Sequence, residues 1–297
     1  MTQTVLILGA TGRFGRHCGS TFAAAGWQLR RFDRARDDLA QAARGVDVIV
    51  AGWNPPYQNW AAEVPTLHEQ VRQAALANDA TVILPGNVYV YGPDAPFGWT
   101  AETPHLARNP LGRIRVQMEA AYRKAGVRTI LLRAGDFLDT EASGNWFDKV
   151  MVPKLPKGIL TYPGRPDAQH AWAYLPDLAR AAVALADKRA ALPRYLDLPF
   201  PGYTLTGQQL ADALSQALAQ PVHLRRLSWA PLHLMRPFMP MMKHLFEMRY
   251  LWDLPHQLDG TAFQNWLPEF VPTPVEHALQ QATRHLPGSA AAQVTAA

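Results

Sequence analysis

The chain has 297 residues, of which 48% are hydrophobic and 18% are charged. These proportions are those of a globular protein with one large core, or with a core domain and a smaller lobe attached to it. The formal net charge of +5 comes from Arg and Lys residues spread along the whole chain and not from a basic block, so we expect no nucleic-acid partner.

Cysteine usage and the N-terminus bear on the cellular compartment. Cys18 is the single cysteine, which excludes an internal disulfide framework and favours a reducing compartment. The N-terminus lacks a basic n-region, and no stretch approaches the roughly 20 uninterrupted apolar residues of a membrane span. The sequence therefore predicts a cytoplasmic protein without a membrane partner.

The first predicted elements are a strand and a helix joined by a glycine turn, in the stretch "TVLILGATGRFGRHCGSTFAAAG". Residues 5–8 are apolar, and the helix closes near Gly26. Gly9 permits the tight turn, Gly12 lets backbone N–H groups approach a pyrophosphate, and Gly15 lets the helix pack closely on the sheet. This context predicts a dinucleotide site that contains Gly9, Thr11, Gly12, Arg13, Phe14 and Gly15.

The second predicted strand, "WQLRRFD", ends where the adenosine ribose of a bound dinucleotide lies. An acid at this point favours the free 2′-hydroxyl of NAD, whereas an arginine favours the 2′-phosphate of NADP. The chain offers both, as Asp33 and Arg34. Arg13 in the glycine turn and Arg36 beyond the strand add positive charge that suits a phosphate. We therefore expect NADP as the cofactor, with NAD as the alternative.

The connection to the next strand is unusually short. Only about a dozen residues separate the second strand from the apolar strand "VDVIVAG", too few for another strand and its crossover. The sheet is therefore expected to lack one strand at this edge. The loop "AGWNPPYQNW" then leaves the carboxyl end of a strand, where such sheets bind ligands. Trp53, Asn54 and Tyr57 are expected to line the cofactor or substrate cleft, and a purely structural proline-rich turn is the alternative.

The alternation continues with a helix, the strand "ATVILPG", a helix over residues 109–126 and the strand "VRTILLRAG". This pattern predicts an α/β fold with a doubly wound parallel Rossmann sheet. From about residue 140 the alternation of strands and helices is interrupted, which indicates a smaller C-terminal substrate lobe. The expected domains are residues 1–138 for dinucleotide binding, with residues about 168–200 packing back onto them, residues 139–286 for most of the lobe, and residues 287–297 as a flexible tail.

One segment of the predicted lobe, residues 228–252, holds five of the eight methionines. Flexible thioethers suit an adaptable apolar pocket or a subunit contact, and an ordinary core helix is the alternative. The expected partner is a small-molecule substrate. A homodimer formed through this segment is a second possibility. The sequence shows no spacing typical of a zinc site, so no metal is expected.

Five stretches resemble the extended branch of the short-chain dehydrogenase/reductase superfamily, which includes NAD-dependent epimerases and dehydratases. "GATGRFG" is similar to the glycine loop of that branch, "LPGNVYVYGP" to its segment ending in V-Y-G, and "LLRAGDFL" to its R-P-x-x-h-G segment, with Ala134 in place of proline. "HAWAYLPDLARAAVALAD" resembles the segment that opens a late helix, and "LDGTAFQNWLPEFVPTPVEHAL" resembles the closing module. The resemblance covers nearly the whole chain and implies a Rossmann fold with a nicotinamide cofactor.

In that family a Ser or Thr near V-Y-G and a later Tyr-x-x-x-Lys pair carry out the proton chemistry. Carried over residue by residue, the serine position falls on Asn87 and the pair on Leu111 and Arg115, so the chain is an atypical member that lacks the pair. Leucine has no titratable group, and arginine stays protonated. The resemblance still implies that Asn87 hydrogen-bonds a substrate oxygen and that Asn87 and Arg115 contact the cofactor, Arg115 through ribose hydroxyls.

A missing acid must then come from elsewhere if the chain is an enzyme. Tyr89 lies two residues beyond Asn87, on the same side of an extended segment, and His170 titrates in the right range. Tyr91 is more typical of a structural tyrosine, and a packed aromatic or a core histidine is the alternative for each candidate. We hypothesise an atypical NAD(P)-dependent oxidoreductase or epimerase-like enzyme with Tyr89, His170 and Asn87 as catalytic residues, acting on a small, partly apolar carbonyl or hydroxyl substrate. The alternative is a catalytically inactive NADP(H)-binding sensor or interaction protein.

Overall fold

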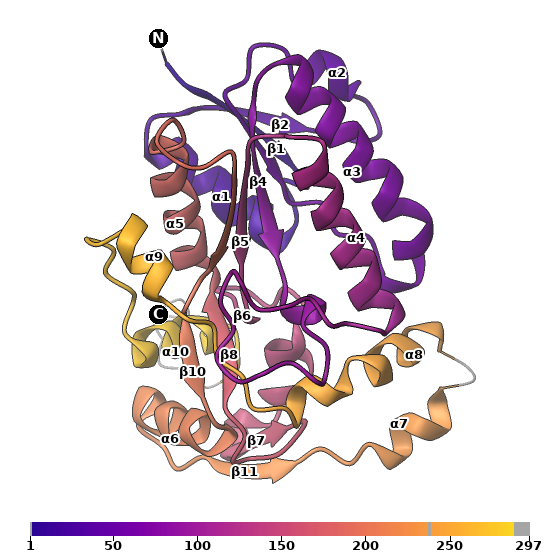
Figure 1. The fold of residues 1–297 in the computed structure, drawn as a ribbon. Helices are drawn as coiled ribbons and strands as arrows, with labels where there is room; N and C mark the ends of the chain where they lie inside the picture. Colours follow the sequence, from indigo (N-terminus) through magenta and orange to yellow (C-terminus); the bar gives the residue numbers. More distant parts are fainter. Residues whose placement is uncertain (1, 237–238, 288–297) are drawn as a thin grey trace.

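The computed structural model describes residues 2–236 and 239–287. Its main sheet has six parallel strands in the order β2-β1-β3-β4-β5-β9. The carboxyl ends of these strands face the smaller lobe (Figure 1). The strands are β1 (Thr4–Leu8), β2 (Gln28–Phe32), β3 (Val48–Ala51), β4 (Thr81–Gly86), β5 (Thr129–Arg133) and β9 (Tyr195–Pro199).

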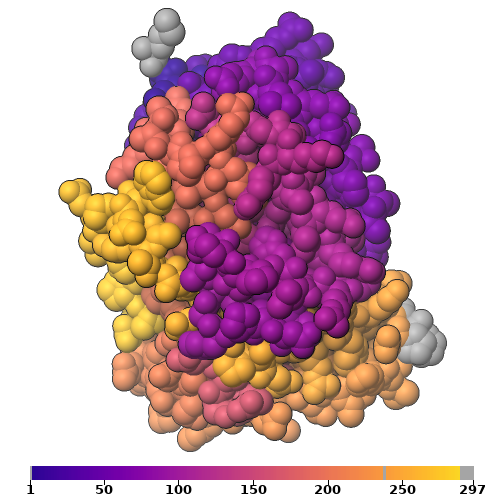
Figure 2. All heavy atoms as spheres, viewed as in Figure 1, coloured from indigo at the N-terminus to yellow at the C-terminus, as the bar shows by residue number. Residues whose placement is uncertain are grey.

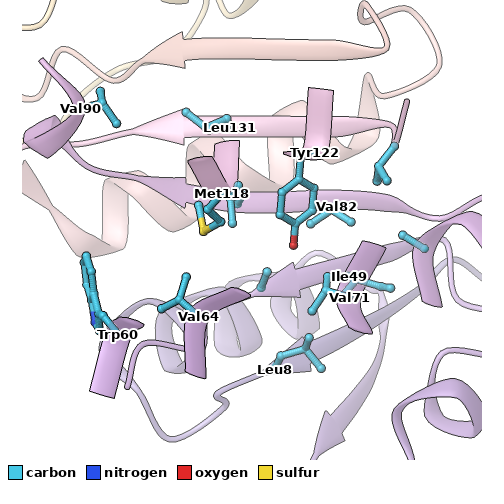
Figure 3. Close-up of a cluster of buried hydrophobic side chains, with 14 of the residues drawn as sticks. Leu8, Ile49, Trp60, Val64, Val71, Val82, Val90, Met118, Tyr122 and Leu131 are labelled. Carbon is cyan, nitrogen blue, oxygen red and sulfur yellow. The ribbon is translucent and has the colours of Figure 1, made fainter. Parts of the chain in front are cut away.

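Helices cover both faces of the main sheet, which is why its central strands are apolar on both sides (Figure 1). Val5 and Ile7 of β1 belong to the core beneath α1 and α5, whereas Leu6 and Leu8 belong to the core beneath α3 and α4. Figure 3 shows this second core, where strand side chains meet Tyr122 and other residues of the two helices. The predicted doubly wound α/β fold is confirmed. The four helices are α1 (Arg13–Ala24), α3 (Trp60–Ala77), α4 (Pro110–Lys124) and α5 (Leu175–Asp187).

Strand β2 forms the edge of the main sheet. Residues 36–45 contain the single short helix α2 (Leu39–Ala42), and the chain then enters β3, which pairs with β1 on the side opposite β2. The expected loss of one strand at this edge is therefore confirmed. The physical reason is length, because a parallel strand needs a crossover of a dozen or more residues in addition to the strand itself.

The smaller lobe has a three-stranded sheet in the order β10-β8-β6 and a two-stranded sheet of β11 and β7. A separate core lies between these sheets and the helices α6 and α10, which pack against each other. The strands are β6 (Asp136–Leu138), β7 (Ile159–Tyr162), β8 (His170–Tyr174), β10 (Tyr203–Leu205) and β11 (His223–Arg226). The helices are α6 (Gly207–Leu218), α7 (Ala230–Met235), α8 (Pro240–Glu247), α9 (Thr261–Trp266) and α10 (Val275–Thr283).

The chain crosses between the two parts more than once. Strand β8 pairs within the lobe, but α5 then packs on α1 and β9 joins the main sheet. Helices α7 and α8 (orange) lie at the lower right of Figures 1 and 2, with α8 next to the first turn of α4. From Gly288 onward the predicted flexible tail lies outside the described residues. Within the described residues, no helix combines the length and the apolar character that crossing a membrane requires.

Candidate functional site

The glycine turn between β1 and α1 is too crowded for side chains. Gly9 has φ +72°, and a Cβ on it would stand 2.8 Å from the Gly52 carbonyl oxygen. A Cβ on Gly15 would collide with the Gly9 carbonyl oxygen, and one on Gly12 would lie 3.2 Å from the same atom. Gly9 and Gly15 therefore let the turn and the helix approach the end of β3, and Gly12 lets the chain pass directly from the turn into α1.

The first turn of α1 offers backbone donors to an anion. Gly12 is the N-cap residue, and it has no side chain that could accept from the backbone N–H groups of the first turn. No acidic residue lies in this turn. The amides of Arg13, Phe14 and Gly15 have no acceptor within the helix, because the first N–H groups of a helix never do. The positive end of the helix dipole adds to them. Exposed Thr11 precedes this turn, and the side chain of Phe14 is buried below it.

The segment that follows β6 is tied to the first two turns of α1. Arg13 Nε donates to the Ser143 carbonyl oxygen at 3.1 Å. Asp139 accepts from Arg16 at 3.0 Å and lies 2.7 Å from His17 Nε2. Burial raises the pKa of Asp139, but its contacts with His17, Ser143 and Arg16 outweigh burial and lower the pKa to about 2. Asp139 is thus a carboxylate at neutral pH and holds residues 139–145 beside the glycine turn.

A groove of about 800 Å³ runs between the end of β2 and α3. It brings together Arg34 from the turn after β2, Trp53 from the loop after β3 and Glu63 from α3. The Trp53 ring packs edge-on against Phe32 with centroids 5.4 Å apart, and Arg34 Nη1 lies 3.3 Å from Glu63. The groove lies on the side of the sheet where the additional strand is missing. Asn54 is exposed next to Trp53.

The charges at the end of β2 form local contacts. Asp33 accepts from the Ala35 amide at 2.9 Å, and its other carboxylate oxygen lies 3.6 Å from Arg36 Nε. The side chains of Arg34 and Arg36 are 61% and 85% exposed, so both can turn toward a ligand. Arg13, by contrast, is engaged with the Ser143 segment.

Two tyrosines meet at the carboxyl edge of the sheet. Tyr57 begins the short helix η1 (Tyr57–Asn59) after β3, and Tyr89 lies in the short helix η2 (Val88–Val90) after β4. Their hydroxyl oxygens are 2.6 Å apart. Burial raises the pKa of Tyr57, although the hydrogen bond with Tyr89 lowers it. Burial and the neighbouring charges of Tyr57 and Asp136 raise the pKa of Tyr89 well above its ordinary value, so both hydroxyls are protonated at neutral pH.

Asn87 joins the tyrosine pair to the core. It caps η2, and its Oδ1 accepts from the Tyr89 amide at 3.1 Å. Its carbonyl oxygen accepts from Arg133 Nη1 at 2.7 Å. Asn87 and Tyr89 therefore sit in one fixed turn at the end of β4, and the structure brings these two sequence-predicted residues together.

His170 contacts Asp136, and Asp136 in turn lies near the tyrosine pair. Its Nε2 lies 2.7 Å from Asp136 Oδ2, and its ring stacks on Trp252 with centroids 4.3 Å apart. His170 is buried, whereas the Asp136 side chain is 32% exposed. The charge of Asp136 raises the pKa of both Tyr57 and Tyr89, which places this carboxylate near the pair.

The sequence analysis did not single out Asp136. The signal available in the sequence was its position directly after Gly135 in the stretch "LLRAGDFL". A Cβ on Gly135 would collide with the Ala171 backbone, so β6 and β8 approach closely at this point. Asp136 and His170 are brought together by that approach, which joins segments far apart in the sequence.

Leu111 and Arg115 are buried in helix packing. Leu111 is 1% exposed and belongs to the core under α4. Its amide donates to Glu247 Oε1 at 2.6 Å, and Asn109 Nδ2 donates to the same oxygen at 2.8 Å. A carboxylate from α8 therefore caps the first turn of α4. Arg115 donates to the Pro85 carbonyl oxygen at 2.7 Å, and its side chain is 8% exposed.

Positions 111 and 115 of α4 are therefore packed around a leucine and an arginine, with no room for a phenol at position 111. We expect the double substitution Leu111→Tyr with Arg115→Lys to lower stability by roughly 1 to 3 kcal/mol, because an added phenol must displace packed groups. It should not raise turnover of any substrate. Chemical denaturation and steady-state kinetics measure both effects. Gln117→Tyr, an exposed change on the same helix, is the control. A double variant with unchanged stability and faster turnover would contradict this account.

Tyr91 has a structural position. Its ring stacks on Trp99 with centroids 4.4 Å apart, and its hydroxyl donates to the Thr100 carbonyl oxygen at 3.3 Å. His105, Glu119 and Asp197 offer three ligand atoms within 4.8 Å of one another, but the Arg133 guanidinium donates to both carboxylates. The Arg133 guanidinium therefore occupies the place beside these carboxylates that a metal cation would take.

No protein-family model matches the chain, and no curated protein sequence matches it. Its structure nevertheless resembles solved structures over nearly its whole length. A UDP-glucose 4-epimerase from Brucella ovis in complex with NAD is 16% identical, with a TM-score of 0.71 over 96% of this chain and 98% of that chain. A nucleoside-diphosphate-sugar epimerase from Pseudomonas aeruginosa is 14% identical, with a TM-score of 0.70 over 95% and 96% of the two chains.

An L-threonine dehydrogenase from Cupriavidus necator, solved in its apo form, is 15% identical, with a TM-score of 0.70 over 95% of this chain and 98% of that chain. The chain thus shares the fold of these two nucleotide-sugar epimerases and of this dehydrogenase. The resemblance in the sequence motifs predicted this fold.

Proposed function

We propose that the chain is a nicotinamide-dinucleotide-dependent oxidoreductase or epimerase-like enzyme that acts on a carbonyl or hydroxyl of a small, partly apolar molecule. The observation that carries the proposal is the Tyr57–Tyr89 hydroxyl pair, with its oxygens 2.6 Å apart at the carboxyl edge of the sheet. It supplies phenolic protons in a fold whose helix α4 carries Leu111 in place of a phenol. The NAD in the Brucella ovis epimerase supports the choice of cofactor class.

The residues of the glycine turn suit a dinucleotide. The first-turn amides of α1 would hold its pyrophosphate, because they are free donors at the positive end of a helix and no side chain fills the turn. The groove beside Arg34 and Trp53 would receive the adenosine half. When bound, the cofactor supplies or accepts hydride at its nicotinamide ring.

The proton chemistry belongs to the tyrosine pair. In the reducing direction Tyr89 donates its proton to the substrate oxygen as negative charge develops there, and the Tyr57 hydroxyl donates to the Tyr89 oxygen left behind. The nearby Asp136 charge raises the pKa of Tyr89, which favours its return to the protonated form. Asn87 would orient the substrate oxygen through its amide. The raised pKa values of Tyr57 and Tyr89 keep both hydroxyls protonated at neutral pH, so the pair enters the reducing reaction with its protons in place.

The test is oxidation of NADPH or NADH by a panel of aldehydes and ketones, followed by the absorbance of the reduced nicotinamide. We expect at least one carbonyl compound to be reduced in a reaction that requires Tyr89. A cofactor that binds tightly and that no carbonyl compound oxidises would instead favour an inactive NADP(H)-binding sensor. Burial of Leu111 and Arg115 is the observation in favour of that second function.

NADPH should bind more tightly than NADH. Arg34 and Arg36 are exposed at the end of β2, and a guanidinium can exchange its surface contact with Glu63 for the 2′-phosphate. Arg34→Ala should weaken NADPH binding by roughly tenfold or more, the effect of one charge-assisted hydrogen bond, and should leave NADH binding nearly unchanged. Fluorescence titration of both cofactors measures this, with Arg44→Ala as the control. Equal affinities, or no loss in the Arg34 variant, would leave Asp33 as the selector and refute NADP.

A further inference from the structure

The methionine-rich segment of the lobe contains a positively charged hollow. It has a volume of about 570 Å³ and opens between α7 and α8. Its lining carries four side chains that are cationic or become so on protonation, and no carboxylate. The lining residues are His233, Arg236, Pro240, Lys243 and His244.

The two permanent charges of this hollow are Arg236 and Lys243, and among its lining residues His244 lies beside a carboxylate. Arg236 and Lys243 form no ion pair within the described part of the chain. Glu247 is the carboxylate nearest in sequence on α8, but it accepts from Asn109 and from the Leu111 amide. The Glu247 carboxylate is thus held at the first turn of α4 and beside His244, and it forms no ion pair with the lysine or the arginine.

The two histidines of the hollow are held in place by their neighbours. The ring of His233 lies against Phe246 with centroids 3.9 Å apart. His244 Nδ1 lies 3.6 Å from the second Glu247 carboxylate oxygen. Fixed imidazoles beside a flexible lysine and arginine form a set of donors around one space, and such a set suits an anion with several acceptor oxygens.

The hollow shares a wall with the tyrosine pair. Helix α8 packs on η1, and the ring of His244 lies 6.3 Å from the ring of Tyr57. His244 therefore lines the hollow on one side and lies close to Tyr57 on the other. In Figure 2 the same segment (orange) borders the magenta region of α4, on the side where the lobe meets the main domain.

We infer that the hollow between α7 and α8 binds a phosphate group, and that this group belongs to the molecule on which the Tyr57–Tyr89 pair acts. The first part stands on the hollow, its four basic side chains and the missing ion-pair partners of Arg236 and Lys243. The second part rests on the proposed function. Two neighbouring cations without ion-pair partners attract anions and raise their local concentration, so the site also favours capture of a phosphorylated substrate over its neutral analogue.

A phosphate group can come from a soluble molecule or from a lipid head group. Three large apolar side chains near the hollow are exposed: Leu234 by 79%, Met235 by 45% and Met239 by 37%. Apolar side chains beside basic ones also suit the surface of an anionic membrane. The experiment therefore needs one arm for each source.

The first arm is calorimetric titration of inorganic pyrophosphate into the protein saturated with NADPH, which keeps the probe out of the glycine turn. The double variant Arg236→Gln with Lys243→Gln should bind pyrophosphate roughly tenfold or more weakly than the unaltered chain. The control, Arg225→Gln with Arg226→Gln, removes the same charge from exposed positions of β11 and should change affinity by no more than about twofold. Equal losses in both variants, or none in either, would overturn the phosphate site.

The second arm is sedimentation with phosphatidylglycerol vesicles, with phosphatidylcholine vesicles for comparison. We expect no binding to either. Binding to phosphatidylglycerol vesicles that is lost in Leu234→Ser with Met235→Ser, together with no pyrophosphate binding, would overturn the soluble source and assign the segment to a membrane surface.

The third arm tests the link to the proposed function. For a carbonyl substrate that carries a phosphate, the Arg236 and Lys243 variant should have a KM roughly tenfold higher with kcat nearly unchanged, and a neutral substrate should show no such change. An unchanged KM would refute the substrate part. If no carbonyl compound is turned over, the proposed function fails, whereas the pyrophosphate titration still decides the phosphate site.

Discussion

Tyr89→Phe is expected to lower kcat by roughly 100-fold or more while cofactor affinity stays nearly the same. The substitution keeps the ring but removes the hydroxyl that faces Tyr57 at 2.6 Å. The effect should appear in kcat, because the proton is transferred in the transition state and not when the substrate binds. Steady-state kinetics with the best carbonyl substrate, and titration with NADPH, measure the two quantities separately.

Tyr91→Phe is the matched control, because its hydroxyl contacts the Thr100 carbonyl oxygen and not the tyrosine pair. Tyr57→Phe should have an intermediate effect of roughly fivefold to tenfold, since it removes one hydrogen bond from Tyr89. Activity that survives both Tyr89→Phe and His170→Ala would remove the two candidate acids that the sequence indicates.

The pH dependence of the same reaction follows from the tyrosine pKa values. Burial and the neighbouring charges raise the pKa of Tyr89, so its protonated, donating form persists above the ordinary pKa of tyrosine. Reduction should therefore lose no rate to deprotonation of Tyr89 up to about pH 10. A loss of kcat near neutral pH would point to a histidine as the donor.

The second large effect concerns the buried arginine of β5. Arg133 is fully buried, and its guanidinium donates to Glu119 at 2.8 Å and to Asp197 at 2.6 Å. Arg133→Met should lower the free energy of unfolding by roughly 3 to 5 kcal/mol, because it leaves two carboxylates buried without a partner. Urea denaturation followed by tryptophan fluorescence measures this. Activity should fall as well, since Arg133 also holds the Asn87 carbonyl.

Arg113→Met on the exposed side of α4 is the control for loss of a cation, and it should change stability by less than about 0.5 kcal/mol. The triple variant Arg133→Met, Glu119→Leu, Asp197→Leu should recover most of the loss, because it removes the unpaired charges together with the arginine. A triple variant as unstable as Arg133→Met would show that packing at this position, and not charge, dominates.

The sequence alone determined the frame of the main domain. The glycine turn and the length of the stretch before β3 follow from rules that act within a few residues, namely which residues accept a left-handed turn and how many residues a crossover needs. The alternation of apolar strands with helices predicted the parallel sheet, because each helix is long enough to serve as the crossover between two parallel strands. Asn87 and Tyr89 were found together because they occupy one turn.

The tertiary structure decided which side chains from distant segments meet. Tyr57 and Tyr89 are 32 residues apart, and only the adjacency of β3 and β4 brings their hydroxyls together. Asp136 reaches His170 because β6 pairs with β8 in a second sheet, and no periodicity in the sequence reports that pairing. Glu247 caps α4 from 136 residues away. Such contacts depend on how whole elements dock, which is set by the sum of many packing interactions and not by local preference, so the sequence could name the candidates but not their partners.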